Sequence, residues 1–221
     1  MSTDEPPLIN VASLMTGGHR SATSLHQVHE YLVSLTQPHP DLGRPGAICP
    51  FLRRALDERL IWFRLFPGAA PPLSEVAEVI LNCRDVLLAL APQTGNDAKL
   101  KTVITVFPDV RAVDAPHIVD RVQRQLKADF VPLGLMVGQF HPLEDTPGLH
   151  NAQFRPLRSC VPMLAIRSMV PSDFNFVRDS PDLVKAYISN FGNAIPEKLR
   201  PAVREAARRF HLALPKEADH A

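Results

Sequence analysis

Apolar residues recur along this chain at helical spacing in some segments and fill short continuous runs in others. The first helical set is Leu25, Val28, Leu32 and Leu35. It predicts a helix that begins near Ser24 and ends at Pro38. Comparable stripes predict one helix that begins near Ser74, another near Asp114 and a last one over about 196–214.

Four runs of apolar and β-branched residues predict strands between these helices. They lie at 60–66, 101–107, 133–140 and 161–170. Helices and strands alternate along most of the chain, which predicts a sheet covered by helices. No helical pattern separates the last two runs, so these strands can run antiparallel. The predicted fold class is therefore α+β: a mixed α/β sandwich around a mixed sheet of about four strands, with helical N- and C-terminal extensions.

The length predicts one domain with extensions. Residues 1–20 have little to bury and are expected to be a flexible N-terminal extension. Residues 21–215 are expected to form a single α/β domain, which is long enough to enclose a large core. Residues 216–221 are expected to be a polar tail.

The composition is that of a globular protein with almost no net charge. Apolar residues make up 45% of the 221 residues, and 24 Lys and Arg residues stand against 23 Asp and Glu residues. This balance gives no field that would attract nucleic acid or an anionic membrane surface, and no apolar run approaches the roughly 20 residues that span a bilayer. We therefore expect a soluble protein with neither nucleic acid nor a membrane as a partner.

The cysteines and the start of the chain favour the cytoplasm. Cys49, Cys83 and Cys160 are odd in number and widely separated, so a disulfide framework is not expected. The first residues, MSTDEPPLIN, are acidic and contain proline, unlike the basic start and apolar middle of a signal peptide. The apolar stripe of the last predicted helix can pack on the core or on a second copy of the chain; the core is favoured, and a homodimer is left open.

Common cofactor and catalytic motifs are absent from the sequence. It contains no GxGxxG, no GxxxxGK[ST] and no GxSxG, so dinucleotide binding, P-loop chemistry and an α/β-hydrolase nucleophile have no support. His26 and His29 lie one helical turn apart. Catalytic zinc takes three protein ligands and no third is near, so a solvated helix face is the preferred interpretation.

A rigid, proline-rich loop over 38–51 contains His39 and Cys49. The thiol precedes a predicted helix, whose N-terminal dipole would lower the pKa of Cys49 and increase its reactivity. Cys49 is thus a candidate nucleophile, metal ligand or redox group, with His39 as a polar neighbour. The alternative is a cysteine that packs the start of the helix, and the pattern alone favours this alternative.

A second candidate segment begins where the third predicted strand ends. GQFHP places His141 directly after that strand, and His150 follows in the loop before the fourth strand. A neutral imidazole at this place can bind iron or act as a base. Arg155 and Arg158 follow, and guanidinium groups bind carboxylates. The alternative is a structural loop covered by surface arginines, which the pattern alone favours.

Several of these segments together resemble a group of uncharacterised bacterial domains that share a CPF motif. The matching segments are ICPF, TVFPD, GQFHP, QFRPLRS and VPMLAIR. The resemblance extends from about His39 to Asp173, which is most of the chain.

The layout is also distantly similar to the YqcI/YcgG family, which includes haem-dependent oxygenases that hydroxylate nitrogen of arginine-type substrates. The corresponding residues are Cys49-Pro50-Phe51, Gly138, His141-Pro142, Asn151, Gln153-Phe154 and Leu157-Arg158. After the His-Pro pair, this chain has the acidic segment LEDTPGLH, where that family has an arginine-rich stretch.

This resemblance implies a haem-dependent oxygenase that acts on an amino acid or amine, with N-oxidation in a biosynthetic pathway. It implies that His141 is the metal ligand of haem b, and that Arg158 and Arg155 bind propionates or a substrate carboxylate. The candidate catalytic side chains are His39, Cys49 and His150. Two alternatives stand beside it: a non-catalytic small-molecule-binding or interaction module, and a thiol-dependent enzyme that uses Cys49.

Overall fold

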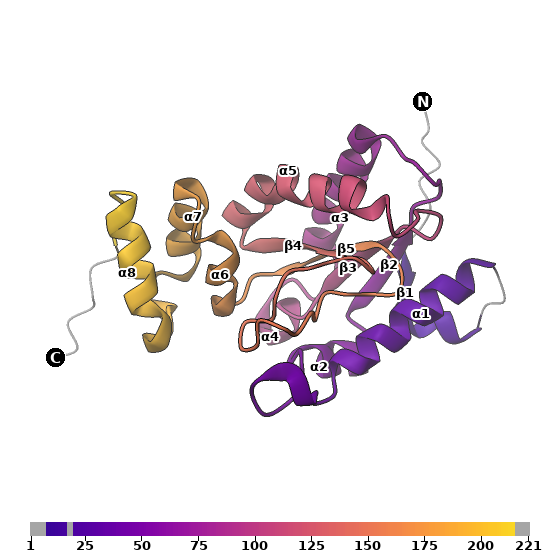
Figure 1. The fold of residues 1–221 in the computed structure, drawn as a ribbon, viewed down its shortest axis with the longest axis horizontal. Coiled ribbons are helices and arrows are strands. Elements are labelled where there is room, and N and C mark those ends of the chain that lie inside the picture. The colour runs from indigo at the N-terminus through magenta and orange to yellow at the C-terminus, as the bar shows by residue number, and fades with distance from the viewer. Residues whose placement is uncertain (1–7, 17–19, 215–221) are drawn as a thin grey trace. The chain divides into compact units, whose positions relative to one another are not determined.

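The structure, a computed structural model, describes residues 8–16 and 20–214. Residues 1–7 and 17–19 of the predicted N-terminal extension, and the predicted polar tail 216–221, lie outside the described residues. Within the described part, the chain forms eight α-helices and a five-stranded sheet (Figure 1). The predicted α+β class is therefore confirmed, with one strand more than expected.

The chain divides into two compact units. The first runs up to Gln125 and includes Val137–Arg167, and the second combines Leu126–Met136 with the residues from Ser168 onward. Each unit contains a cluster of buried apolar side chains of its own. The single domain predicted over 21–215 stays a prediction.

The sheet is mixed in direction, as predicted. Its strands are β1 (Ile9–Asn10), β2 (Ile61–Leu65), β3 (Thr102–Val106), β4 (Leu135–Phe140) and β5 (Met163–Ser168). Their order across the sheet is β1-β2-β3-β5-β4. Strand β1 is antiparallel to β2, β2 is parallel to β3, and β3 is antiparallel to β5. Strand β4 therefore lies at an edge of the sheet.

The four predicted strands correspond to β2, β3, β4 and β5, and each lies inside its predicted run. Strand β1 is the unpredicted addition. It consists of two residues that pair with Trp62 and Phe63. A two-residue strand shows no alternation of its own, so only its partner reveals it.

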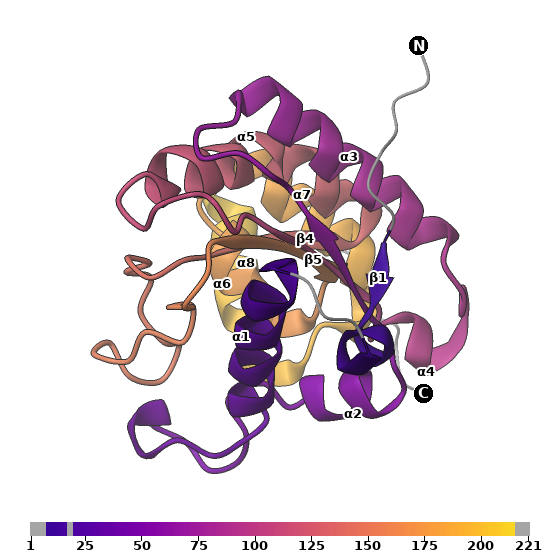
Figure 2. The same cartoon turned by 90° about the vertical axis from the view of Figure 1, so that its right-hand side faces the viewer.

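One face of the sheet packs against α1 (Arg20–Leu35) and α2 (Leu52–Asp57) (Figure 2). Phe63 of β2 and Ile104 of β3 are paired and both are buried in this layer. The α1 stripe predicted from the sequence supplies the helical side, with Leu25, Val28, Leu32 and Leu35. Burial of large aliphatic and aromatic side chains between two layers is the main force that holds this unit together.

The other face of the sheet lies against α3 (Leu73–Ala89) and the start of α5 (Arg121–Phe130), while α4 (Gly95–Ala98) is a short helix before β3. Polar side chains join β2 and β3 to α3. Arg64 donates to the Asn82 Oδ1 at 3.1 Å, and the Thr105 hydroxyl lies 3.7 Å from the Cys83 sulfur. Cys83 is fully buried between this helix and the sheet.

The second unit is helical. It contains α6 (Phe174–Val177), α7 (Pro181–Phe191) and α8 (Arg200–Arg209). Val203, Ala206 and Ala207 of α8 are buried within this unit, so the apolar stripe of the last helix packs on a core, as favoured from the sequence. Among the described residues, no helix has both the length and the apolar character that crossing a bilayer requires.

Candidate metal centre

Asp120 lies where a π-helical turn passes into α5. Pro116–Asp120 adopts the π form, and α5 continues from Arg121. A π turn changes the direction in which its side chains leave the helix, and such turns are frequent at functional sites. One turn further on, the buried Gln123 donates from Nε2 to the Val137 carbonyl of β4 at 3.1 Å. This bond holds the start of α5 against the edge strand.

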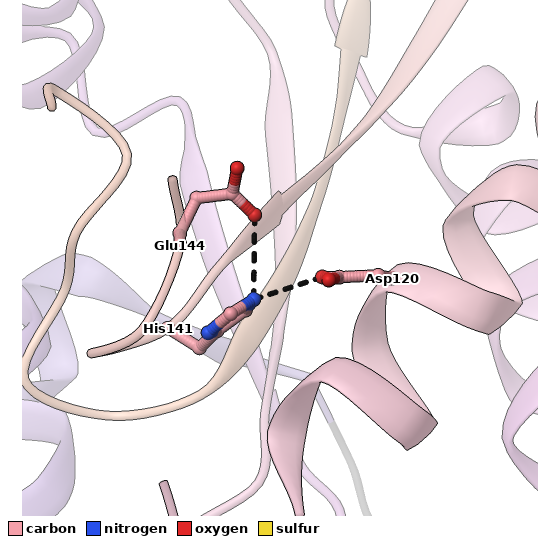
Figure 3. A group of neighbouring side chains, drawn as sticks. All are labelled: Asp120, His141 and Glu144. Atoms are coloured by element: carbon pink, nitrogen blue, oxygen red, sulfur yellow. Dashed lines mark hydrogen bonds and ion pairs between the residues drawn. The ribbon is translucent and has the colours of Figure 1, made fainter. Parts of the chain in front are cut away.

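His141 and Glu144 are the two ends of a single turn that follows β4. The Glu144 N–H donates to the His141 carbonyl at 3.1 Å. Pro142 takes the second position of this four-residue turn, which its fixed φ favours. The turn brings the Glu144 carboxylate to the imidazole, and Asp120 approaches the same ring nitrogen from the helix (Figure 3).

The three side chains converge on one nitrogen atom. His141 Nε2 lies 2.9 Å from Asp120 Oδ1 and 3.3 Å from Glu144 Oε2. One ligand atom from each residue lies within 4.8 Å of the other two. Among the described residues, this is the one group of three or more His, Cys, Asp or Glu side chains with ligand atoms this close.

The group is buried and rich in negative charge. His141 is 1% exposed and Glu144 is 4% exposed, while the Asp120 side chain is 26% exposed. Burial raises the pKa of the Asp120 carboxyl, and the nearby Glu144 acts in the same direction, while His141 and the Arg124 charge lower it. Among the described residues, neither carboxylate forms an ion pair with a lysine or arginine. A protonated imidazole would neutralise one carboxylate, and the other would have no lysine or arginine within ion-pair distance among the described residues.

Two of the three separations are compatible with a bound ion. Ligand bonds of about 2.1 Å would place neighbouring ligand atoms ~3.0 Å apart in octahedral geometry and ~3.4 Å apart in tetrahedral geometry. The two distances from His141 Nε2, 2.9 Å and 3.3 Å, lie in or near this range, and the shorter one is also that of a hydrogen bond. One imidazole and two carboxylates are also a ligand set that divalent transition metals accept.

The second ring nitrogen of His141, Nδ1, is buried and has no hydrogen-bond partner among the described residues. A proton at Nδ1 would therefore be a buried donor without an acceptor, which is unfavourable. The neutral ring is expected to carry its proton on Nε2, where Asp120 accepts it. A metal ion at Nε2 would replace that proton.

Arg155 and Arg158, predicted to bind a cofactor or substrate carboxylate, both bind Asp145. Arg155 Nε and Arg158 Nη2 donate to Asp145 Oδ1 at 2.8 Å and 3.0 Å. The hydrogen bond from Arg155 is the largest cause of the lowered pKa of the Asp145 carboxyl. Arg158 Nε also donates to the Glu144 carbonyl at 2.9 Å. The two arginines thus support the turn that carries Glu144.

The loops that carry His39 and His150 lie against each other, because the Asn151 Nδ2 donates to the Asp41 carbonyl at 2.8 Å. His39 Nδ1 accepts from the Asp41 N–H at 3.1 Å, and its ring stacks on Phe154 with centroids 4.7 Å apart. His150 is exposed, and a Cβ on Gly43 would lie 2.6 Å from its carbonyl oxygen. Glycine at position 43 is therefore required for this close approach of the two loops. Catalysis by His39 or His150 stays a prediction.

Cys49 lies in the same loop as His39, at the edge of the first unit's core. It is partly buried, and its N–H donates to the Leu35 carbonyl at 2.8 Å. Among the described residues, no hydrogen bond or ion pair links His39, Cys49 or His150 to Asp120, His141 or Glu144. The roles predicted for His39, Cys49 and His150 stay predictions.

Sequence reasoning identified His141 and missed its two partners. Glu144 lies in the acidic segment LEDTPGLH. The spacing His-Pro-Leu-Glu, from His141 to Glu144, is a signal for a turn that joins its ends. Asp120 lies in a predicted helix, 21 residues before His141. Nothing local in the sequence indicates that this carboxylate reaches the end of β4.

The side chains fit a small ion better than haem. An axial histidine presents a nitrogen to iron at the centre of a wide porphyrin ring. Here Nε2 faces two carboxylates within 3.3 Å, and the arginines expected to bind propionates are engaged with Asp145. Haem binding by His141 stays a prediction from the resemblance.

Comparison with known proteins identifies the family and gives no activity. A family model described as "Domain of unknown function (DUF6875)" matches residues 25–202. Because the match covers most of the chain, the chain belongs to this family. Searches of curated proteins and of solved structures gave no match.

Proposed function

We propose that this member of the DUF6875 family is a metal-dependent enzyme that binds a divalent transition-metal ion through Asp120, His141 and Glu144. One observation carries the proposal: two carboxylates converge on one imidazole nitrogen that is nearly inaccessible to solvent. Buried charges need a compensating partner. A divalent cation would balance both carboxylates and replace the proton on Nε2.

The ligand set favours Mn²⁺, Fe²⁺ or Zn²⁺. Carboxylates suit hard ions, and imidazole suits zinc and iron, so a mixed set lies between these preferences. Three protein ligands leave coordination positions open, which is typical of catalytic rather than structural sites. When bound, such an ion supplies a Lewis acid or a redox centre for a small-molecule substrate.

The residues have separate tasks in this proposal. Asp120 and Glu144 supply negative charge from a helix and from a turn, and His141 supplies the nitrogen between them. The bond from Gln123 to the Val137 carbonyl keeps the helix at the strand. Burial of the ring excludes bulk water from one side of the ion, which strengthens every electrostatic interaction there.

A metal titration tests the proposal. The purified chain is stripped with a chelator and titrated with Mn²⁺ and Zn²⁺ by calorimetry, beside His141→Ala. We expect one ion per wild-type chain and loss of that binding in the variant. Binding that is equal in both proteins, or absent from both, would overturn the proposal.

The haem-dependent oxygenase is the second candidate, because its predicted ligand is the same buried histidine. The visible spectrum of the chain after addition of haemin distinguishes the two. A Soret band that is lost in His141→Ala, together with no Mn²⁺ or Zn²⁺ binding, would favour haem. A chain that binds neither would favour the non-catalytic module.

A further inference from the structure

We infer that Thr146 is a positioning residue that leaves Glu144 a single oxygen for the ion and so selects a small transition metal over Ca²⁺. This inference rests on the proposed metal site. The two oxygens of Glu144 have different surroundings: Oε2 faces His141 Nε2 at 3.3 Å, whereas Oε1 accepts two hydrogen bonds from Thr146.

Both donors of Thr146 are directed to the same oxygen. Its N–H donates to Glu144 Oε1 at 2.8 Å, and its hydroxyl donates to that oxygen as well. A carboxylate oxygen has two lone-pair positions, so Oε1 is fully engaged. Oε2 is left as the oxygen that can bind an ion, and binding through both oxygens would require release of the Thr146 hydroxyl.

The local sequence explains why this arrangement is fixed. Pro147 follows Thr146 and restricts its backbone to extended conformations, which orients the Thr146 N–H. On the other side, Arg158 Nε holds the Glu144 carbonyl at 2.9 Å. Glu144 is therefore held at its backbone and at one side-chain oxygen, while the other oxygen points to the imidazole.

This geometry has a consequence for metal choice. Ca²⁺ takes six to eight oxygen ligands and commonly binds a carboxylate through both oxygens. Zn²⁺ and Mn²⁺ are satisfied by fewer ligands. A Glu144 that offers one oxygen disfavours Ca²⁺ relative to these ions.

The test uses Thr146→Val, which keeps the shape and the backbone N–H but removes the hydroxyl, and Thr146→Ser, which restores it. Thr94→Val is the matched control, because Thr94 is exposed and its side chain makes no capping hydrogen bond at α4. Dissociation constants for Mn²⁺ and for Ca²⁺ are measured on each metal-free protein, together with its melting temperature.

We expect Thr146→Val to weaken Mn²⁺ binding roughly tenfold, as the loss of a hydrogen bond to a metal ligand typically does. Ca²⁺ binding should weaken less, so the preference for Mn²⁺ narrows, while Thr146→Ser and Thr94→Val resemble the wild type. An unchanged Mn²⁺ to Ca²⁺ preference in Thr146→Val would overturn the role of Thr146 and leave the metal site standing. A wild-type chain that binds no Mn²⁺ would overturn both.

Discussion

Glu144 and Asp145 are adjacent carboxylates with opposite surroundings. Asp145 is 74% exposed at its side chain and is bound by Arg155 and Arg158. Glu144 is buried and faces His141 and, through that ring, Asp120. The chain itself neutralises the first carboxylate, and among the described residues it provides no lysine or arginine for the second.

This difference separates a structural charge from a candidate ligand. An exposed carboxylate paired with arginine has a lowered pKa and fixes a loop, as Asp145 does. Glu144 is buried, accepts two hydrogen bonds from Thr146 at one oxygen and faces His141 with the other, so a cation would compensate the charge that these neutral donors leave. The turn from His141 to Glu144 therefore has the charge pattern of a site that is completed by a ligand.

Among substitutions that keep the shape of the side chain, the largest effect is expected from Glu144→Gln, which removes the charge. Loss of one charged ligand should cost about 3–5 kcal/mol of binding, or at least ~100-fold in the Mn²⁺ dissociation constant. The exposed Glu78 provides the matched control, Glu78→Gln, which should bind like the wild type. Equal affinity in both variants would mean that Glu144 is no ligand.

Asp120→Asn should reduce Mn²⁺ affinity by roughly 10- to 100-fold, less than the change at Glu144, because Asp120 is partly exposed. In the metal-free protein, Asp120→Asn should raise the free energy of unfolding. A raised carboxyl pKa means that stability is present below the unfolded pKa and is lost as the pH rises through the folded pKa. At neutral pH the uncharged side chain of Asp120→Asn avoids this loss of stability. A metal-free Asp120→Asn protein that melts below the wild type would contradict the charge balance described for the site.

Substitution of both arginines, Arg155→Gln with Arg158→Gln, should weaken Mn²⁺ binding about three- to tenfold. The Glu144 carbonyl loses its donor from Arg158, and the turn is held less firmly. Calorimetric titration with Mn²⁺ measures the effect. A loss as large as that of Glu144→Gln would indicate that the arginines contact the ion's other ligands directly.

The smallest effect is expected at Cys49. Cys49→Ser should change Mn²⁺ affinity by less than about twofold, because among the described residues Cys49 has no hydrogen bond or ion pair with the candidate site. Reaction with iodoacetamide at neutral pH measures the reactivity of the thiol separately. Rapid alkylation of Cys49 would support the thiol-dependent alternative.

The sequence was sufficient for β2 to β5 and for the α1 stripe, because continuous apolar runs and helical spacing are local signals. The start of α3 at Leu73 agrees with the prediction near Ser74, but the start of α1 was less accurate: it begins at Arg20, whereas the pattern placed it near Ser24. Capping signals act over a few residues, and several positions satisfy them equally well.

The site was predictable only in part, for a physical reason. His141 could be found because it follows a strand directly, at a position where scaffolds carry binding groups. Asp120 reaches it through the packing of α5 on β4 and through a π turn, both of which depend on tertiary contacts. The spacing from His141 to Glu144 predicts a turn that joins the two residues, but the burial of Glu144 depends on the same packing.

Anomalous X-ray scattering from crystals grown with Mn²⁺ tests the central claim most directly. The expected result is a single strong peak, at the manganese edge, bonded to Asp120 Oδ1, His141 Nε2 and Glu144 Oε2. The same crystals would show Glu144 Oε1 still bound to Thr146. A fully occupied manganese elsewhere, with His141 still hydrogen-bonded to Asp120, would contradict the claim.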